Sequence, residues 1–131
     1  MKANELRLHN YVLEDGQVVL LSTNYDLFKC LVNVDRGIGF EPIPLTEEWL
    51  LKLGFEKIPK KQYMTLFFSE SDLSKADNLR QRIDFWFGDI DFQAAELCFY
   101  GVCFKRVKMQ YVHQLQNLCF ALTGQELTIL S

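Results

Sequence analysis

The sequence predicts a single α+β domain over residues 1–131: a twisted, mainly antiparallel sheet built from hairpins, with two helices packed on it. Three observations lead to this prediction. Hydrophobic residues make up 49% of the chain, which is enough to bury one core at this length. Aromatic residues make up 14% and favour sheets, because their side chains pack well on a pleated surface. Two segments, 46–53 and 111–122, show the apolar spacing of helices.

The first third of the chain is predicted to form hairpins. Asp15 and Gly16 separate two apolar stretches and suit a two-residue type I′ turn. Residues 22–26 are polar and predict a loop, residues 27–34 alternate as a strand, and residues 35–39 turn the chain again. Three short strands with tight turns allow a partial SH3-like barrel in this N-terminal part.

The first predicted helix, residues 46–53, has signals at both ends. Thr46 is a suitable N-cap, and Glu47 and Glu48 complement the positive end of the helix dipole. Lys52 complements the negative end, and Gly54 supplies the left-handed stop. The helix is therefore short but well specified.

The central part of the chain is predicted to supply the remaining strands. Alternating or apolar runs predict them at residues 55–58, 63–68, 83–87, 90–92, 97–99 and 102–107. The most polar stretch, residues 69–82, predicts an exposed loop.

The last helix, residues 111–122, is almost free of charge and ends at Gly124, before a short strand-like tail at residues 126–130. An apolar stripe about 120° wide predicts a buried face, formed by Tyr111, Val112, Leu115, Leu118, Cys119 and Leu122. The second face also lacks charge and carries His113, Gln116, Asn117 and Phe120. Two interpretations stay open: this face packs beneath another element of the same chain, or it is an interface with another protein or a second copy.

Charge and hydropathy limit the classes of function. The formal net charge of −3 argues against broad attraction to nucleic acids or anionic membranes. The first residues are charged, and no stretch approaches the roughly 18 apolar residues of a membrane span. We therefore expect a cytoplasmic protein without membrane contact, whose cysteines are buried free thiols rather than disulfides.

Two sequence blocks carry a resemblance to a known family. PLTEEWLLKLGF at residues 44–55 and YVHQLQNLCFALTG at residues 111–124 resemble a family of small uncharacterised proteins of gut anaerobic bacteria, and NELR at 4–7 with NYV at 10–12 is similar to their usual opening. The two main blocks cover about a fifth of the chain. Members are often found near phage or other mobile-element genes. No assigned activity comes with the resemblance, so it implies no catalytic residues.

Two clusters of potential metal ligands occur in the sequence. Cys98, Cys103, His113 and Cys119 include the usual zinc ligands, but Cys119 and His113 lie about 120° apart around the last helix, which opposes a shared tetrahedral site. The acidic group is Asp84, Asp89, Asp91 and Glu96. Its spacing is unspecific, because solvated acids on a sheet face are commoner than metal sites. We predict no metal, no cofactor and no catalytic residues.

Basic residues form two clusters beside aromatic strands: Lys57, Lys60 and Lys61, and Lys105, Arg106 and Lys108. Aromatic side chains next to cations can hold single-stranded nucleic acid, although lysines on strand edges also serve solubility. The leading hypothesis is a non-enzymatic interaction or accessory protein, acting through the second face of the last helix or the 69–82 loop. A nucleic-acid-binding module is the alternative, and an enzyme with a dispersed site ranks third.

Overall fold

A computed structural model describes residues 1–57, 59, 63–67, 82–86, 93–99, 102–103 and 106–129. Helices and antiparallel sheets are both present, so the predicted α+β class is confirmed. The chain divides into two compact units: unit 1 contains Met1–Leu45 and Tyr111–Thr128, and unit 2 contains Thr46–Gln110 and Ile129–Ser131. Folding of both units as one domain stays a prediction.

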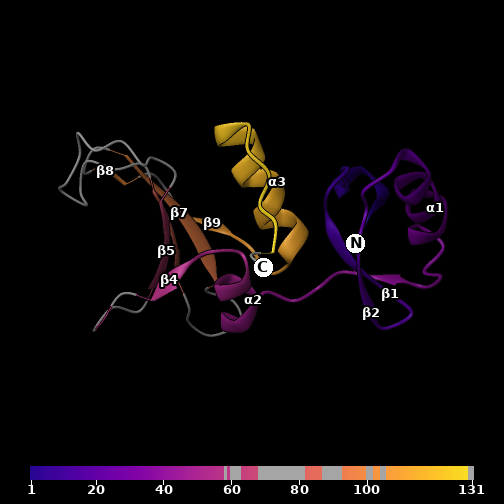
Figure 1. The fold of residues 1–131 in the computed structure, drawn as a ribbon, viewed down its shortest axis with the longest axis horizontal. Coiled ribbons are helices and arrows are strands. Elements are labelled where there is room, and N and C mark those ends of the chain that lie inside the picture. Colours follow the sequence, from indigo (N-terminus) through magenta and orange to yellow (C-terminus); the bar gives the residue numbers. More distant parts are fainter. Residues whose placement is uncertain are drawn as a thin grey trace. The chain divides into compact units, whose positions relative to one another are not determined.

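Unit 1 combines a three-stranded sheet with helices (Figure 1). Its elements are a short 3-10 helix η1 (Ala3–Glu5), β1 (Tyr11–Glu14), β2 (Gln17–Leu20), α1 (Asn24–Val34), β3 (Phe40–Glu41) and α3 (Val112–Thr123). The strands are antiparallel in the order β2-β1-β3. This order is open within the described residues, and an SH3-like arrangement stays a prediction.

The hairpin turn between β1 and β2 is confirmed. Asp15 has φ 50° and Gly16 has φ 83°, and Glu14 pairs with Gln17 on either side of them. Positive φ at both central residues is what a type I′ turn requires. The Asp-Gly pair therefore sets the register of the whole hairpin.

The prediction of a strand at residues 27–34 is wrong, because these residues belong to α1. The hydroxyl of Thr23 accepts a hydrogen bond from the Asp26 amide at 3.1 Å, which caps the start of the helix. Burial then follows helical spacing: Cys30 and Val34 face the core, whereas Phe28 is 67% exposed. An alternating strand would place Phe28 on the same face as Cys30.

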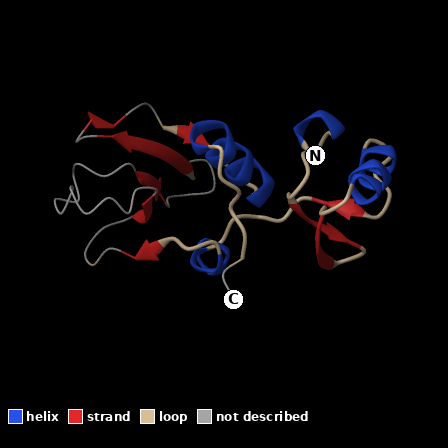
Figure 2. Ribbon diagram, turned by 45° about the horizontal axis from the view of Figure 1, so that its top comes forward, coloured by secondary structure: helices blue, strands red, loops and turns tan. Residues whose placement is uncertain are grey.

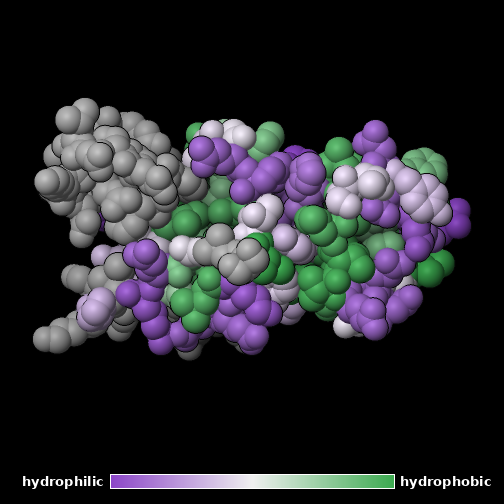
Figure 3. All heavy atoms as spheres, viewed as in Figure 1, coloured by the Kyte–Doolittle hydropathy of each residue, from purple (hydrophilic) through white to green (hydrophobic). Residues whose placement is uncertain are grey.

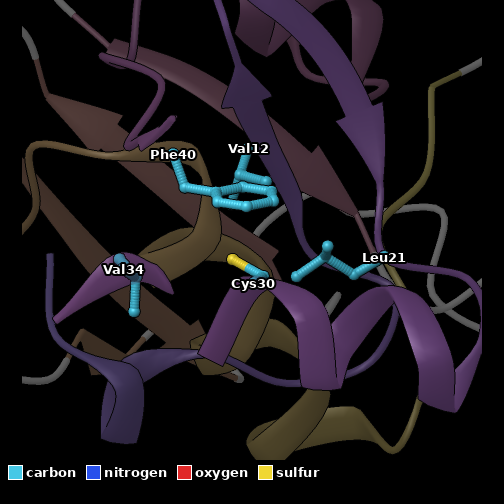
Figure 4. Close-up of a cluster of buried hydrophobic side chains, with 5 residues drawn as sticks. All are labelled: Val12, Leu21, Cys30, Val34 and Phe40. Carbon is cyan, nitrogen blue, oxygen red and sulfur yellow. The ribbon is translucent and has the colours of Figure 1, made fainter. Parts of the chain in front are cut away.

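The core of unit 1 lies between α1 and the sheet. Five buried side chains converge there, as Figure 4 shows: Val12, Leu21, Cys30, Val34 and Phe40. Val12 comes from β1 and Phe40 from β3, while α1 contributes two of the five. This packing fixes which side of α1 remains outside.

The last helix forms as predicted and ends at Gly124, whose φ is 74°. At its start, the Gln114 side chain accepts a hydrogen bond from the Tyr111 amide at 3.1 Å. Leu115 and Cys119 of the apolar stripe are buried, but Leu122 is 45% exposed, so burial of the entire stripe is not observed. Residues 125–129 form no strand, which corrects the expectation of a strand-like tail.

The described part of unit 2 contains an antiparallel sheet and helix α2, and Figure 2 colours strands red and helices blue. Its elements are α2 (Glu47–Lys52), β4 (Glu56–Lys57), β5 (Tyr63–Phe67), β6 (Arg82–Trp86), β7 (Ala94–Phe99), β8 (Val102–Cys103) and β9 (Val107–Lys108). The strand order is β4-β5-β6-β7-β8, and β9 also pairs with β7. No helix in the described part of the chain has both the length and the apolarity to cross a membrane.

Helix α2 confirms its predicted boundaries. The Thr46 hydroxyl accepts a hydrogen bond from the Trp49 amide at 3.2 Å, and Gly54 has φ 99°. Lys52 lies 3.4 Å from the Glu48 carboxylate, one helical turn away. Trp49 is buried, which anchors the helix through its apolar side.

The predicted strands of unit 2 correspond to β4, β5, β6 and parts of β7, β8 and β9. Residues 69–81 of the predicted loop lie outside the described residues, as do the Gly88–Asp89 turn and residues 90–92. Arg82, which was assigned to that loop, begins β6. On the sheet, Met64, Phe85 and Ala95 are cross-strand neighbours on one buried face.

Candidate functional site

The outward side of α1 carries large apolar side chains. Tyr25 is 73% exposed, Phe28 is 67% exposed and Val32 is 41% exposed. At 100° per residue, these three fall within an arc of about 60°, so they form one stripe along the helix. We call these three residues the α1 stripe. Over α1, the surface in Figure 3 shows hydrophobic residues among hydrophilic ones.

A cavity of about 330 Å³ lies between α1 and the sheet of unit 1. It is lined by the apolar residues Val19, Leu20, Leu21 and Phe40 and by the charged residues Glu14, Asp26 and Lys29. Its volume is at the lower end of the roughly 300–1,000 Å³ of small-ligand pockets. The lining combines apolar and charged side chains, which suits a side chain or small ligand of mixed polarity.

One ion pair crosses this cavity lining. The Lys29 ammonium of α1 lies 2.8 Å from the Glu14 carboxylate of β1. The hydrogen bond to ionised Glu14 raises the pKa of Lys29, so the lysine remains charged. Lys29 also lies about 40° from Tyr25 around the helix, which makes the cavity and the α1 stripe adjoining surfaces.

The second face of α3, predicted as a possible interface, takes part in hydrogen bonds within unit 1. Gln116 is completely buried, accepts from the Tyr11 amide at 2.9 Å and donates to the carbonyls of His9 at 2.8 Å and Leu127 at 3.0 Å. Asn117 donates to the Glu5 carbonyl at 2.7 Å. These two residues therefore hold chain segments from before β1 and after α3.

Arg7 extends this network toward the surface. Its guanidinium bonds to the side chain of Asn117 at 3.1 Å and forms an ion pair with Glu126. It also lies over the Phe120 ring, 4.2 Å from the centroid. Phe120 is 38% exposed, so it is the outermost of the four predicted interface residues. Its role in an interface stays a prediction.

His113 occupies an unusual position on the same face. His113 is completely buried. Neither ring nitrogen has a hydrogen-bond partner among the described residues. The ring stacks on Tyr111 with centroids 5.9 Å apart and planes inclined by 10°. Burial lowers the pKa of His113 below its ordinary value, and Glu5 only partly opposes this effect.

Because the folded state keeps His113 neutral, stability is expected to depend on pH. The folded-state pKa lies below the ordinary 6.5 of the unfolded chain, so the unfolded state takes up the proton first as pH falls. The free energy of unfolding should decrease below pH 6.5, by up to about 1.4 kcal/mol per pH unit, until the folded-state pKa is reached. Urea unfolding between pH 5.5 and 7.5 measures this slope.

A matched pair of variants isolates the contribution of His113. His113→Leu removes the buried titrating group. The free energy of unfolding should then change less steeply with pH, by up to about 1.4 kcal/mol per pH unit, which corresponds to one proton. His9→Asn is the control, because His9 is the only other histidine and its positive φ of 72° suits asparagine. A slope that persists unchanged in His113→Leu would contradict the assignment.

The second face of the unit 2 sheet, opposite that of Met64 and Phe85, carries several polar side chains, of which Thr65 and Asp84 are buried. Asp84 of β6 and Glu96 of β7 are directly opposed in the register. The Arg82 guanidinium lies 3.2 Å from Asp84, the Thr65 hydroxyl donates to Asp84 at 2.7 Å, and the Arg106 guanidinium lies 2.9 Å from Glu96. The two carboxylates therefore each have a basic partner, which offsets the repulsion between like charges on neighbouring strands.

Aromatic rings adjoin these charges. Tyr63 and Trp86 are cross-strand neighbours with ring centroids 4.6 Å apart, and the Arg106 guanidinium lies 4.0 Å from the Trp86 ring centroid. The Trp86 indole nitrogen is buried and has no hydrogen-bond partner among the described residues. An arginine, a tryptophan and a tyrosine thus follow one another across the sheet.

The structure places the remaining basic candidates apart from this arrangement or leaves them undescribed. Lys57 forms an ion pair with Glu47 of α2. Lys108 of β9 is exposed. Lys60, Lys61 and Lys105 lie outside the described residues. Only Arg106, of the six predicted nucleic-acid contacts, is observed beside aromatic rings in the described part of the chain.

No group of three or more potential metal ligands occurs within the described residues. Asp89 and Asp91 of the acidic cluster lie outside them, as do the side chains of Cys98 and Cys103. Cys119 and His113 are both described and both buried. The predicted absence of a metal site stays a prediction.

The two described thiols are expected to react slowly. Burial raises the pKa of Cys30 to about 11, with a contribution from nearby Glu14, and burial alone raises the pKa of Cys119 to about 12. At pH 8, iodoacetamide should label both thiols at least about 100-fold more slowly in the native protein than in urea. Peptide mass spectrometry measures each rate, and equal native and denatured rates would contradict the burial.

The α1 stripe was missed by the sequence analysis because residues 27–34 were predicted to be a strand. Two signals could have identified it. Thr23 and Asp26 form an N-terminal capping pattern, and Tyr25, Phe28 and Val32 have the spacing of one helical face.

Comparisons with protein-family models, with curated proteins and with solved structures found no match to this chain.

Proposed function

We propose that this protein acts by binding another protein through the α1 stripe of unit 1. The observation that carries this proposal is the exposure of Tyr25 and Phe28 on one helical face, at 73% and 67%. Large aromatic side chains at a surface are costly to hydrate and are enriched at the centres of protein interfaces. Val32 continues the stripe by one turn.

The surroundings of the stripe support a protein partner. The adjoining cavity is lined by both apolar and charged residues, and interfaces likewise combine apolar anchors with polar groups. The side chains on the second face of α3 are largely engaged within unit 1, whereas those of the α1 stripe are not buried. This proposal keeps the predicted interaction function and moves its centre from α3 to α1.

Photo-crosslinking in the native host tests the proposal. Replacing Phe28 with p-benzoylphenylalanine should give a discrete heavier adduct, because the side chain lies within the proposed interface. The same replacement at Glu41, which is exposed on β3, is the control. The adduct formed from position 25 should also decrease in a Phe28→Ser background. Adducts no stronger at positions 25 and 28 than at position 41 would contradict the proposal.

A second candidate function is the binding of single-stranded nucleic acid beside Arg106 and Trp86, on the second face of the unit 2 sheet. The arrangement of Arg106, Trp86 and Tyr63 favours it, because bases stack on aromatic rings beside cations. Fluorescence anisotropy with labelled oligonucleotides at low and physiological salt measures binding. Arg106→Ala with Lys108→Ala should weaken binding and reduce its salt dependence, and an absence of binding even at low salt would contradict this function.

A further inference from the structure

The β2 strand presents an open hydrogen-bonding edge. It is the outer strand in the order β2-β1-β3 of the described residues. In a two-residue hairpin the residues beside the turn, Glu14 and Gln17, exchange hydrogen bonds, and bonded pairs then alternate along the ladder. The backbone groups of Val18 and Leu20 therefore point away from β1.

Neighbouring hydrogen bonds confirm this direction. The Leu21 amide donates to the Asn10 carbonyl at 3.0 Å, and the Leu21 carbonyl accepts from the His9 amide at 2.8 Å. The backbone groups of Leu21 face β1. Because backbone groups alternate in direction along a strand, those of the preceding residue Leu20 face outward. The Leu20 carbonyl accepts from the Ser22 amide at 2.9 Å, which leaves the amides of Val18 and Leu20 and the carbonyl of Val18 for an outside strand.

This edge lacks the features by which proteins usually prevent strand addition. The strand reads Gln-Val-Val-Leu from Gln17 to Leu20, without lysine, proline or any charge. Val18 is 48% exposed. An uncharged edge with outward backbone groups can add an extended peptide, in which backbone bonds give affinity and pockets for side chains give specificity.

We propose that the β2 edge binds an extended peptide segment of the partner protein as a fourth strand, with an apolar side chain in the cavity and a basic side chain beside Asp26. This rests on the proposed function and specifies how the partner is held. The cavity reaches this edge, because Val19 and Leu20 of β2 contribute to its lining. An added strand therefore places side chains next to the cavity.

Charge determines the preference for a basic segment. The cavity lining contains two carboxylates, Glu14 and Asp26, and one ammonium, Lys29. Lys29 forms its ion pair with Glu14, whereas Asp26 accepts a hydrogen bond from the Ser22 hydroxyl and has no ion pair among the described residues. A second copy of β2 offers no basic residue for this position, since its four residues are uncharged. A basic peptide from a different protein fits the charges better.

Amide exchange of ¹⁵N-labelled protein tests strand addition at the backbone groups concerned. The probe is a synthetic ten-residue peptide of alternating valine and lysine. Saturating peptide should slow exchange of the Val18 and Leu20 amides by at least about tenfold, because both become hydrogen-bonded. A peptide with proline at its centre, and one of alternating valine and glutamate, are the matched controls and should protect these amides much less.

Asp26→Asn tests the basic position without changing the shape of the side chain. It should weaken binding of the valine–lysine peptide by about twofold to fivefold, as expected for a partly exposed ion pair. Equal affinity of wild type and Asp26→Asn would overturn the assigned charge contact.

Three other outcomes overturn the proposal. If no peptide protects Val18 and Leu20, the edge does not accept an added strand. If protection increases with protein concentration alone, the occupant is a second copy rather than a peptide. If position 28 gives a partner adduct while the β2 amides remain unprotected in that complex, strand addition fails and the proposed function stands.

Discussion

Replacing Phe85 with alanine is expected to lower the free energy of unfolding of unit 2 by about 3–5 kcal/mol. Phe85 is completely buried and lies in the middle strand of three, between Met64 of β5 and Ala95 of β7. Removing the ring loses its burial and leaves a cavity that neighbouring strands can fill only partly, because the backbone ladder holds them in place.

Tryptophan fluorescence during urea unfolding measures this effect. Both tryptophans of the chain, Trp49 and Trp86, lie in unit 2 and report on its unfolding. The control is Leu51→Ala, since Leu51 is 49% exposed on α2 and its truncation should cost less than about 1 kcal/mol. If Phe85→Ala lowers the free energy of unfolding by less than Leu51→Ala does, Phe85 is not part of a tightly packed core.

The second large effect is expected from Gln116→Leu in unit 1, which should lower the free energy of unfolding by about 3 kcal/mol or more. The substitution retains an apolar side chain of similar size but removes the partners of the Tyr11 amide and of the His9 and Leu127 carbonyls. Each buried polar group left without a partner costs about 1–3 kcal/mol. Gln125→Leu is the matched control at an exposed position.

Circular dichroism at 222 nm and tryptophan fluorescence, compared in the same samples, also test the prediction of a single domain. If Gln116→Leu shifts both transitions equally, the units unfold together, as that prediction requires. If it shifts the dichroism transition and leaves the fluorescence midpoint unchanged, the units unfold separately. If Gln116→Leu unfolds at the wild-type midpoint by both probes, the structural role of Gln116 is contradicted.

Where a local signal suffices, the sequence predicts the structure accurately. The Asp15–Gly16 turn depends only on residues that tolerate positive φ, and both have it. Helix α2 likewise begins at Thr46 and stops before Gly54 because its capping residues act on the adjacent backbone. These features require no knowledge of distant residues.

Where burial depends on distant segments, the sequence is not sufficient. Residues 27–34 contain apolar side chains on both faces, so alternation and helical spacing compete. Phe28 completes an alternating apolar row with Cys30 and Val32, which favours a strand, but in the structure its side chain is exposed. The lack of charge on the second face of α3 is compatible with burial and with an interface, and only the hydrogen bonds of Gln116 to segments before β1 and after α3 show that this residue is buried within unit 1. The candidate site on α1 was missed for the same reason, since it exists only once α1 is recognised as a helix.

The contact between Pro44 and Tyr111 has a consequence for how the chain can change over evolution. Their β-bridge, together with the bond from the Val112 amide to the Ile43 carbonyl at 2.9 Å, holds two passages of unit 1 side by side. Residues 46–110 therefore leave and rejoin unit 1 at adjacent points, as an inserted module does. Insertions whose ends are close together can vary in length and content without disturbing their host. Unit 1 therefore has the arrangement of a host, and we expect changes in the length of the inserted segment to leave the fold of unit 1 undisturbed.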